Sequence, residues 1–272
     1  MENKEEFTRN NIYSEMLKRV IIRCDFFELI EMDKFIEDQK EFLSEYFDQR
    51  RPIEQDQCDI LLRSISGNPN ETPLSRKIKK IIFHFEKFKP QQINATLDIS
   101  SDFFCLNILC ENNYKGSGIF TNFMCLLIEK LRQSNPFACF TRIGIRKIDI
   151  QVMPNKRTSI DNYFDKTFWA GRSWNSSPEK ICSTLTDILK IGDVNFYVIQ
   201  RMDKMSKEDK RRLIYDVDAY IEKDYIANHL ERKTLKECLE HEMQDEMFNL
   251  FRGVASLKYL KKCKEAKERQ PY

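Results

Sequence analysis

Two aspartates near the end of the chain, Asp216 and Asp218, have the residue type and spacing of a metal-dependent hydrolytic site. They fall within 212–222, an alternating segment that predicts a β-strand, so both carboxylates project from the same face. Carboxylates so placed can share a divalent cation, as they do in nucleases and phosphotransferases. The alternative is a solvent-facing pair opposite the apolar positions of the strand. No third acidic residue or lysine at a diagnostic spacing supports the metal site.

A second group of polar residues, His241, Glu242 and Asp245, resembles half of the helix of a zinc protease. His241 and Asp245 would lie one helical turn apart on one face. The second histidine of that motif is missing, and the chain has only 3 histidines. We therefore expect a salt-bridged, exposed helix face, and we predict neither a metal ion nor a cofactor.

The segment Gly116-Ser117-Gly118 precedes a predicted helix and could present backbone N–H groups to a phosphate. It lacks the lysine of a nucleotide-binding loop and the glycine spacing of a dinucleotide site, so a tight turn with a helix cap is favoured. Cysteine catalysis requires a thiolate near a base, but Cys105, Cys110 and Cys125 have apolar neighbours and are expected to pack as small hydrophobic residues.

Two groups of basic residues are candidates for contacts with a nucleic-acid backbone. One lies in the strand near 142–147 and the other in the C-terminal helix, where lysines would also complement the helix dipole without any ligand. Tyr114, Phe140, Trp169 or Trp174 could stack on bases. The candidate nucleic-acid-binding residues are Arg142, Arg146, Lys147, Lys258, Lys261 and Lys262.

The composition limits the class of protein that carries these residues. The 272-residue chain has 41% hydrophobic residues, enough for a sizeable core, and a net charge of only +2, so it lacks an overall cationic field. No apolar run reaches the length of a membrane helix, and the first residues do not form a secretory signal. The 9 cysteines include no C-x-x-C pair, which favours reduced thiols and a cytoplasmic location.

Hydrophobic periodicity predicts the elements that would position these groups. Glycine is scarce, with 7 in the chain, so long elements with few tight turns are expected. The predicted strands cover 18–26, 59–65, 80–88, 94–99, 103–109, 139–152, 181–191, 194–202 and 212–222. The predicted helices begin at Asp33, Gly118, Ser159 and Leu230 and end near Phe47, Arg132, Trp169 and Lys264.

The strand 139–152 carries an unusual pattern. Ile143 and Ile145 share one parity, whereas Ile148, Ile150 and Val152 share the other. An alternating pattern changes face when an extra residue is inserted. We therefore predict a β-bulge near 146–147.

Runs of strands followed by helices predict an α+β fold with mostly antiparallel sheets. Each half of the chain contains a strand, a helix, several further strands and a final helix. We therefore expect two similar sheet-and-helix halves, an N-terminal half over 1–137 and a C-terminal half over 138–272 that ends in a long helix.

The segment 97–150, and above all Arg142-Ile143-Gly144-Ile145-Arg146, resembles a sporadically distributed, uncharacterised family of bacterial and archaeal proteins of about 250–275 residues. Gly192–Tyr197 and Asp216–Tyr220 also fit its second half, whereas an N-terminal Pro-Ile-x-Glu-like segment is not present at 18–26. The resemblance implies a bacterial setting, and the patchy distribution is similar to that of genes for antiviral defence or mobile elements.

No catalytic, metal-binding or phosphate-binding group stands out against its structural alternative. We therefore expect a non-enzymatic binding or scaffolding subunit that acts with another protein subunit, in an antiviral defence or mobile-element system. The alternative is a protein that binds nucleic acid, as a nuclease that uses Asp216 and Asp218. A membrane partner is not expected.

Overall fold

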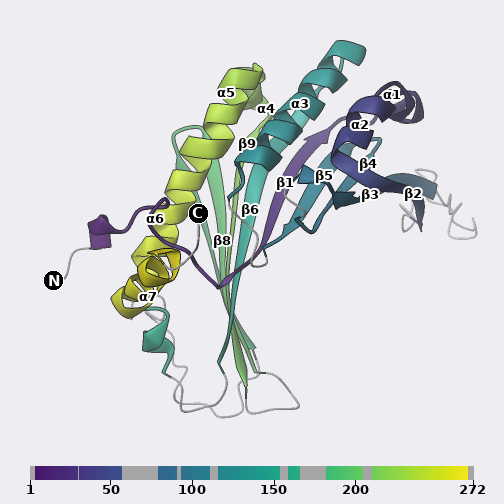
Figure 1. Cartoon of the computed structure of the whole chain (residues 1–272). Helices are drawn as coiled ribbons and strands as arrows, with labels where there is room; N and C mark the ends of the chain where they lie inside the picture. The colour runs from purple at the N-terminus through teal and green to yellow at the C-terminus, as the bar shows by residue number, and fades with distance from the viewer. Residues whose placement is uncertain are drawn as a thin grey trace, which may run out of the picture.

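The fold is a single antiparallel β-sheet with helices packed on one side (Figure 1). The computed structural model describes residues 4–29, 31–56, 79–90, 93–110, 116–153, 159–165, 182–204 and 210–268. Within these residues the sheet has nine strands in the order β2-β3-β4-β5-β1-β6-β9-β8-β7. The strands are β1 (Leu17–Phe26), β2 (Phe47–Asp56), β3 (Lys79–Phe88), β4 (Ala95–Ser100), β5 (Phe103–Leu109), β6 (Phe140–Met153), β7 (Cys182–Ile191), β8 (Val194–Lys204) and β9 (Arg211–Glu222).

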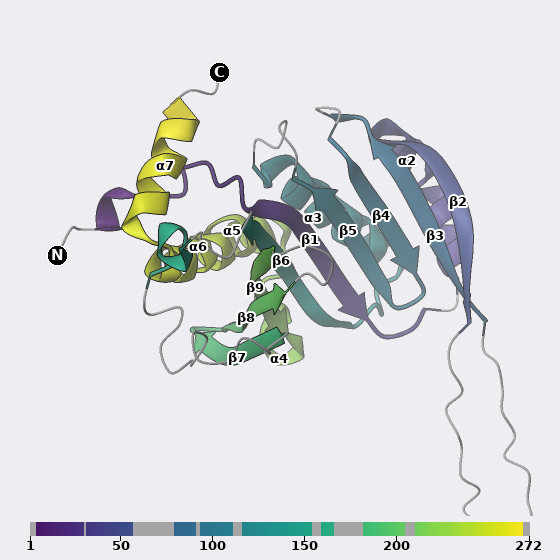
Figure 2. The ribbon, with the colours of Figure 1, turned by 90° about the horizontal axis from the view of Figure 1, so that it is seen from below.

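The helices complete the core on one face of the sheet (Figure 2). Strands β1, β4 and β5 alternate between buried and half-buried residues, as expected where only one face is fully covered. The helices are α1 (Met32–Asp38), α2 (Lys40–Tyr46), α3 (Gly118–Ser134), α4 (Lys223–Ile226), α5 (Arg232–Glu237), α6 (Met243–Val254) and α7 (Leu257–Glu268), with a π-helical turn, η6 (Cys238–Glu242), and short 3₁₀ turns at Lys4–Glu6 and Ile160–Asn162. Among the described helices, none combines the length and apolar character of a membrane span.

Apolar contacts between sheet and helices form one continuous core. Phe123 of α3 packs its ring against Phe42 and Tyr46 of α2, with ring centroids 5.6 and 4.7 Å apart. On the other side of the core, Tyr215 of β9 lies against Phe251 of α6. Aromatic rings bury large apolar areas, so these contacts hold the helices on the sheet.

The expectation of two similar sheet-and-helix halves is wrong. Strand β1, from the start of the chain, pairs directly with β6, and the antiparallel ladder continues without interruption from β2 to β7. The pairing satisfies the backbone groups of both central strands, which would otherwise be two exposed sheet edges. The boundary at 137 stays a prediction.

Most of the predicted strands are confirmed within one or two residues, but several other elements differ. Strand β2 lies in a segment for which we predicted no strand. The helix expected from Asp33 is divided into α1 and α2, with Glu31 at the N-cap. The long C-terminal helix is interrupted by the π-turn and by an extended residue, Ala255. The helix expected from Ser159 is reduced to a 3₁₀ turn in the part of it that is described, and the strand expected at 59–65 lies outside the described residues.

The predicted bulge in β6 is also wrong. Pairing between β6 and β9 is regular from Arg142 to Met153, and the irregularity lies in the neighbouring strand, between Leu17 and Arg19 of β1. The isoleucines at 148 and 150 therefore do face away from the helices, on the half-buried open face. As a consequence, two charged residues, Lys147 and Asp149, occupy the positions that face the helices.

Gly144 is required where β6 and β9 approach each other. A Cβ atom at this position would lie 2.4 Å from the carbonyl oxygen of Ala219 and 2.6 Å from the Cβ of Tyr220. Both neighbours are fixed by the ladder, so the strands would have to separate. We expect Gly144→Ala to lower the free energy of unfolding by about 2 kcal/mol, the range of overpacked cores. Urea denaturation would measure this loss, with Gly253→Ala as a control because a Cβ there meets nothing within 4 Å.

Candidate functional site

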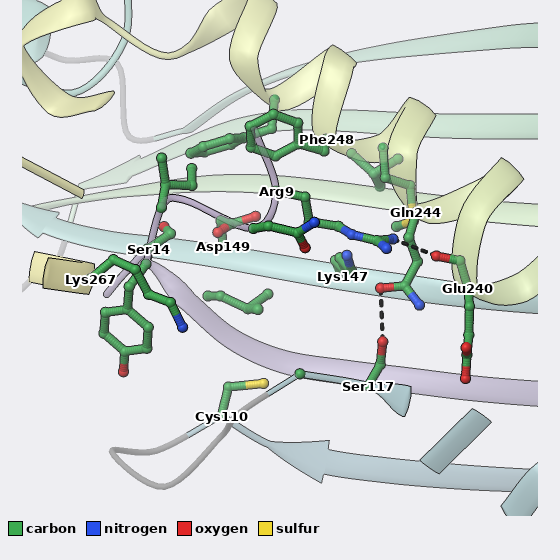
Figure 3. A pocket seen from close by; sticks show the side chains of 18 of the residues that line it. Arg9, Ser14, Cys110, Ser117, Lys147, Asp149, Glu240, Gln244, Phe248 and Lys267 are labelled. Carbon is green, nitrogen blue, oxygen red and sulfur yellow. Dashed lines mark hydrogen bonds between the residues drawn. The ribbon is translucent and has the colours of Figure 1, made fainter. Parts of the chain in front are cut away.

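A pocket of about 370 Å³ lies on the helix-covered side of the sheet (Figure 3). Its floor is formed by β1, β6 and β9, and its walls by the N-terminal segment, the start of α3, the π-turn and α6. This volume is within the range of small-molecule sites. The lining residues used below are Arg9, Tyr13, Ser14, Cys110, Ser117, Lys147, Asp149, Tyr215, Glu240, Gln244, Phe248, Phe251 and Lys267.

Lys147 and Asp149 are the charged residues of the pocket floor. They are two residues apart on β6 and therefore project from the same face. Burial lowers the pKa of Lys147 to about 8 and raises the pKa of Asp149 to about 7. Ser14 forms a hydrogen bond with the carboxyl of Asp149. Among the described residues, no hydrogen bond or ion pair is found for the ammonium group of Lys147.

Further positive charge surrounds Lys147. Arg9, from the N-terminal segment, extends beside it in the pocket (Figure 3), and its charge lowers the pKa of Lys147 further. The guanidinium of Arg9 is held by the main-chain carbonyl of Glu240 and by Asp245, whose carboxylate is 3.2 Å away. The two cations repel each other without a ligand, and an anion between them would relieve the repulsion.

The N-terminus of α3 opens on the same pocket. Gly116 adopts a φ of 118°, which glycine tolerates, and the chain then enters the helix at Gly118. The hydroxyl of Ser117 does not cap the helix but donates to Oε1 of Gln244 at 2.8 Å. The carboxylate of Glu240, which accepts a hydrogen bond from Thr121, already lies beside this first turn and offsets part of its positive charge. The sequence predicts this tight turn. It does not predict that the turn lines the same pocket as Lys147, which follows about 30 residues later in the chain.

The pocket also has an apolar part. The aromatic residues Tyr13, Tyr215, Phe248 and Phe251 contribute to the wall. Burial raises the pKa of Tyr215 far above its usual value, so its hydroxyl stays protonated. The pocket therefore offers an apolar region beside a cationic one, which suits an organic ligand with a ring and an anionic group.

Comparison with known proteins gives no name for this site. No protein-family model matches the chain, and no curated protein shows significant similarity to it. The resemblance to an uncharacterised bacterial and archaeal family therefore stays a prediction.

The predicted acidic pair lies on the opposite, open face of the sheet. Asp216 accepts two hydrogen bonds from Arg146, at 2.8 Å from Nε and 2.5 Å from NH2, and Asp218 accepts one from Arg142. Arg142 also lies over the ring of Tyr220, 4.4 Å from its centroid. These two arginines and two aspartates compensate each other's charge. A divalent cation at the aspartates, or a phosphate at the arginines, would first have to displace an existing ion pair.

Asp216 is therefore expected to contribute to stability. Its side chain is only 8% exposed and that of Arg146 is 40% exposed. Asp216→Asn should lower the free energy of unfolding by about 1–2 kcal/mol, because Arg146 then loses its ion-pair partner. Partial exposure of Arg146 to solvent limits the loss. Urea denaturation would measure the loss. Mg²⁺-dependent cleavage of nucleic acid that disappears in a folded Asp216→Asn variant would instead support the nuclease alternative.

The candidate nucleic-acid-binding residues do not form one surface. Lys147 lies in the pocket on the helix side, whereas Arg142 and Arg146 lie on the open face. In α7, Lys258 donates to Asn162 at 2.8 Å and Lys262 to Glu15 at 3.0 Å. Lys261 also has a contact within the chain. The described lysines of α7 therefore attach this helix to the N-terminal segment and to the 3₁₀ turn.

The cysteines that we expected to be unreactive have raised pKa values where the structure resolves a shift. Burial raises the pKa of Cys105 to about 11 and of Cys110 to about 12. Cys110 lines the pocket but is a protonated thiol there at neutral pH. Phe140, proposed for base stacking, is buried in the core. The other stacking candidates, Tyr114, Trp169 and Trp174, lie outside the described residues.

Proposed function

We propose that the protein is a binding protein for a small organic anion, which it holds in the pocket between β6, the N-terminus of α3 and α6. Lys147 carries this proposal, because it is a half-buried cation on the pocket floor and has no ion-pair partner among the described residues. A buried charge is costly unless it is paired, and a ligand can supply the partner. Phosphate and carboxylate groups share the chemistry that this site would recognise.

The arrangement supports binding more directly than catalysis. Around Lys147 the pocket offers Arg9, which can pair with an anion, and aromatic residues that can enclose a ring. Cys110 is a protonated thiol, so the pocket lacks an activated nucleophile of that type. We therefore keep binding without catalysis as part of this proposal.

Phenyl phosphate is a suitable probe, since it combines a ring with an anionic group. We expect phenyl phosphate, and more weakly inorganic phosphate, to raise the melting temperature, as a ligand that binds only the folded state does. Benzyl alcohol, a neutral ring compound, should not. Benzoate in the same assay distinguishes a carboxylate site from a phosphate site. A melting temperature that no anion raises would contradict the proposal.

A second proposed function, as a subunit that acts with another protein, is supported by β7. This strand lies at the edge of the sheet and exposes apolar side chains, with Ile188 72% exposed. An exposed edge strand can pair with a strand of another chain. The other exposed apolar residues of β7 are Leu185, Leu189 and Ile191.

A partner that binds at this edge would be captured by the wild-type chain and not by an Ile188→Lys variant. We place this partnership in a bacterial cytoplasm, in a defence or mobile-element system. In support of that compartment, the seven cysteines whose side chains the structure describes are free thiols. Capture of equal amounts of the same protein by both variants would exclude β7 as the contact.

A further inference from the structure

Three side chains that are potential metal ligands converge beside the π-helical turn, away from the anion pocket. A ring nitrogen of His229, the Sγ of Cys238 and a carboxylate oxygen of Glu242 all lie within 4.8 Å of one another. Cys238 is fully buried, His229 is half-buried and Glu242 is at the surface. His229 follows α4, whereas the other two residues begin and end the π-turn.

The histidine is already oriented as a metal ligand would be. Its Nδ1 lies 2.9 Å from the main-chain carbonyl oxygen of Tyr225, so Nδ1 carries the proton and donates it. This hydrogen bond leaves the lone pair on Nε2. Metal-bound histidines usually donate their second ring N–H to a carbonyl or carboxylate in this way.

The surroundings of the cysteine favour a cation. The carboxylate of Glu242 lies against the thiol, and Asp193 is a second carboxylate near it. Two negatively charged groups beside a potential ligand atom suit a bound cation. The π-turn is a second indication, since such turns are rare and often occur at functional sites.

We propose that His229, Cys238 and Glu242 form a zinc site with a fourth position open to solvent. Thiolate and imidazole together select zinc over magnesium or calcium, which prefer oxygen ligands. Three protein ligands leave one tetrahedral position for water or for a group of another molecule. Of the three ligands, the sequence indicates only Glu242, together with His241 and Asp245, because the contribution of His229 depends on the fold.

Titration of the metal-free full-length chain with Zn²⁺, in competition with a chromophoric chelator, tests the site. We expect one ion per chain and, with Co²⁺ in place of Zn²⁺, a thiolate-to-cobalt charge-transfer band. Cys238→Ser should abolish this band. Glu242→Gln, at an exposed position that does not disturb the core, should weaken Zn²⁺ binding at least about tenfold.

Two matched controls separate this site from incidental binding. His241→Gln removes an exposed histidine next to Glu242, and Cys105→Ser removes a cysteine on another part of the sheet. Neither variant should change Zn²⁺ affinity. Binding that is unchanged in Glu242→Gln, a charge-transfer band that persists in Cys238→Ser, or a stoichiometry well below one ion per chain would overturn the proposal.

Discussion

Lys147→Met is expected to reduce the affinity for phenyl phosphate at least about 100-fold, because a desolvated charge-assisted contact is worth about 3 kcal/mol. The ammonium group of Lys147 lies at the floor of the pocket, near Arg9 and the start of α3. Methionine keeps the length of the side chain and the apolar packing, and removes only the charge. Isothermal titration calorimetry of the two proteins measures the difference.

The same variant should be more stable than the wild-type protein. Burial lowers the pKa of Lys147 to about 8, compared with about 10.4 in an unfolded chain. Below about pH 8 both states carry the proton, and the folded state pays the full cost of enclosing the charge. Loss of binding with a gain of about 1–3 kcal/mol in the free energy of unfolding would show that the lysine is kept for its ligand.

Lys267→Met is the matched control. Lys267 also lines the pocket, but it lies exposed on α7, where water and salt screen its charge. Its replacement should change the affinity for phenyl phosphate less than about threefold. Equal losses in the two variants would indicate a diffuse electrostatic effect, and an unchanged affinity in Lys147→Met would remove the lysine from the site.

The pattern of residues in β6 already indicates where this pocket lies. The isoleucines of β6 change face between Ile145 and Ile148, and this change led to the prediction of a bulge. The regular pairing of β6 with β9 means that the strand keeps its alternation through this region. In a regular strand, the same change of parity turns two charged residues toward the helices. A parity change without a bulge is thus a signal for a polar cavity inside a sheet protein.

Other parts of the pocket could not be inferred from local pattern. Arg9 comes from the start of the chain and Gln244 from its last helices, and both line the same pocket as Lys147 because β1 and β9 pair with β6 on its two sides. Periodicity identifies a strand and its faces, but it does not identify the neighbouring strand. The same limit explains why two separate halves were wrongly predicted. Nothing in the sequence near β1 shows that β6 forms hydrogen bonds with its edge.

The open face illustrates a different limit. Asp216 and Asp218 lie on one face of β9, as the sequence predicts. Arg142 and Arg146 likewise share one face of β6. The sequence presents these as two separate candidate sites, one for a metal and one for nucleic acid. Because β6 and β9 are adjacent, the two sets compensate each other. Opposite charges at matching spacing in two strands can thus indicate a cross-strand ion pair as well as two sites.

Asp149→Asn is expected to raise the stability of the protein, and by an amount that grows with pH. Burial raises the pKa of Asp149 to about 7, compared with about 3.9 in the unfolded chain. Between these values the unfolded state is ionised while the folded state holds its proton, so the wild-type protein loses stability as the pH rises from about 4 to about 7. Above about pH 7 the carboxyl of Asp149 is ionised in both states, and the folded state carries the whole free-energy cost of burying this charge.

Asparagine preserves the shape of the side chain and does not ionise. The gain in free energy of unfolding should therefore be larger at about pH 8 than at about pH 5, by about 3 kcal/mol, because one pKa unit corresponds to about 1.4 kcal/mol. Urea denaturation of both proteins at the two pH values measures this difference. A gain that is independent of pH would mean that Asp149 is not protonated in the folded state at about pH 5.

Anion binding should respond to the same proton. In the wild-type protein the affinity for phenyl phosphate should fall from about pH 6 to about pH 9, as Asp149 gains a negative charge and Lys147 then loses its positive charge. In Asp149→Asn the part of this decrease that is due to Asp149 should disappear, and the part that is due to Lys147 should move below about pH 8, because the charge of Asp149 raises the pKa of Lys147. Phenyl phosphate also begins to titrate in this range, so benzoate, whose charge is constant above about pH 6, serves as the control probe. If both proteins show the same pH profile with benzoate, the carboxyl of Asp149 does not face the ligand.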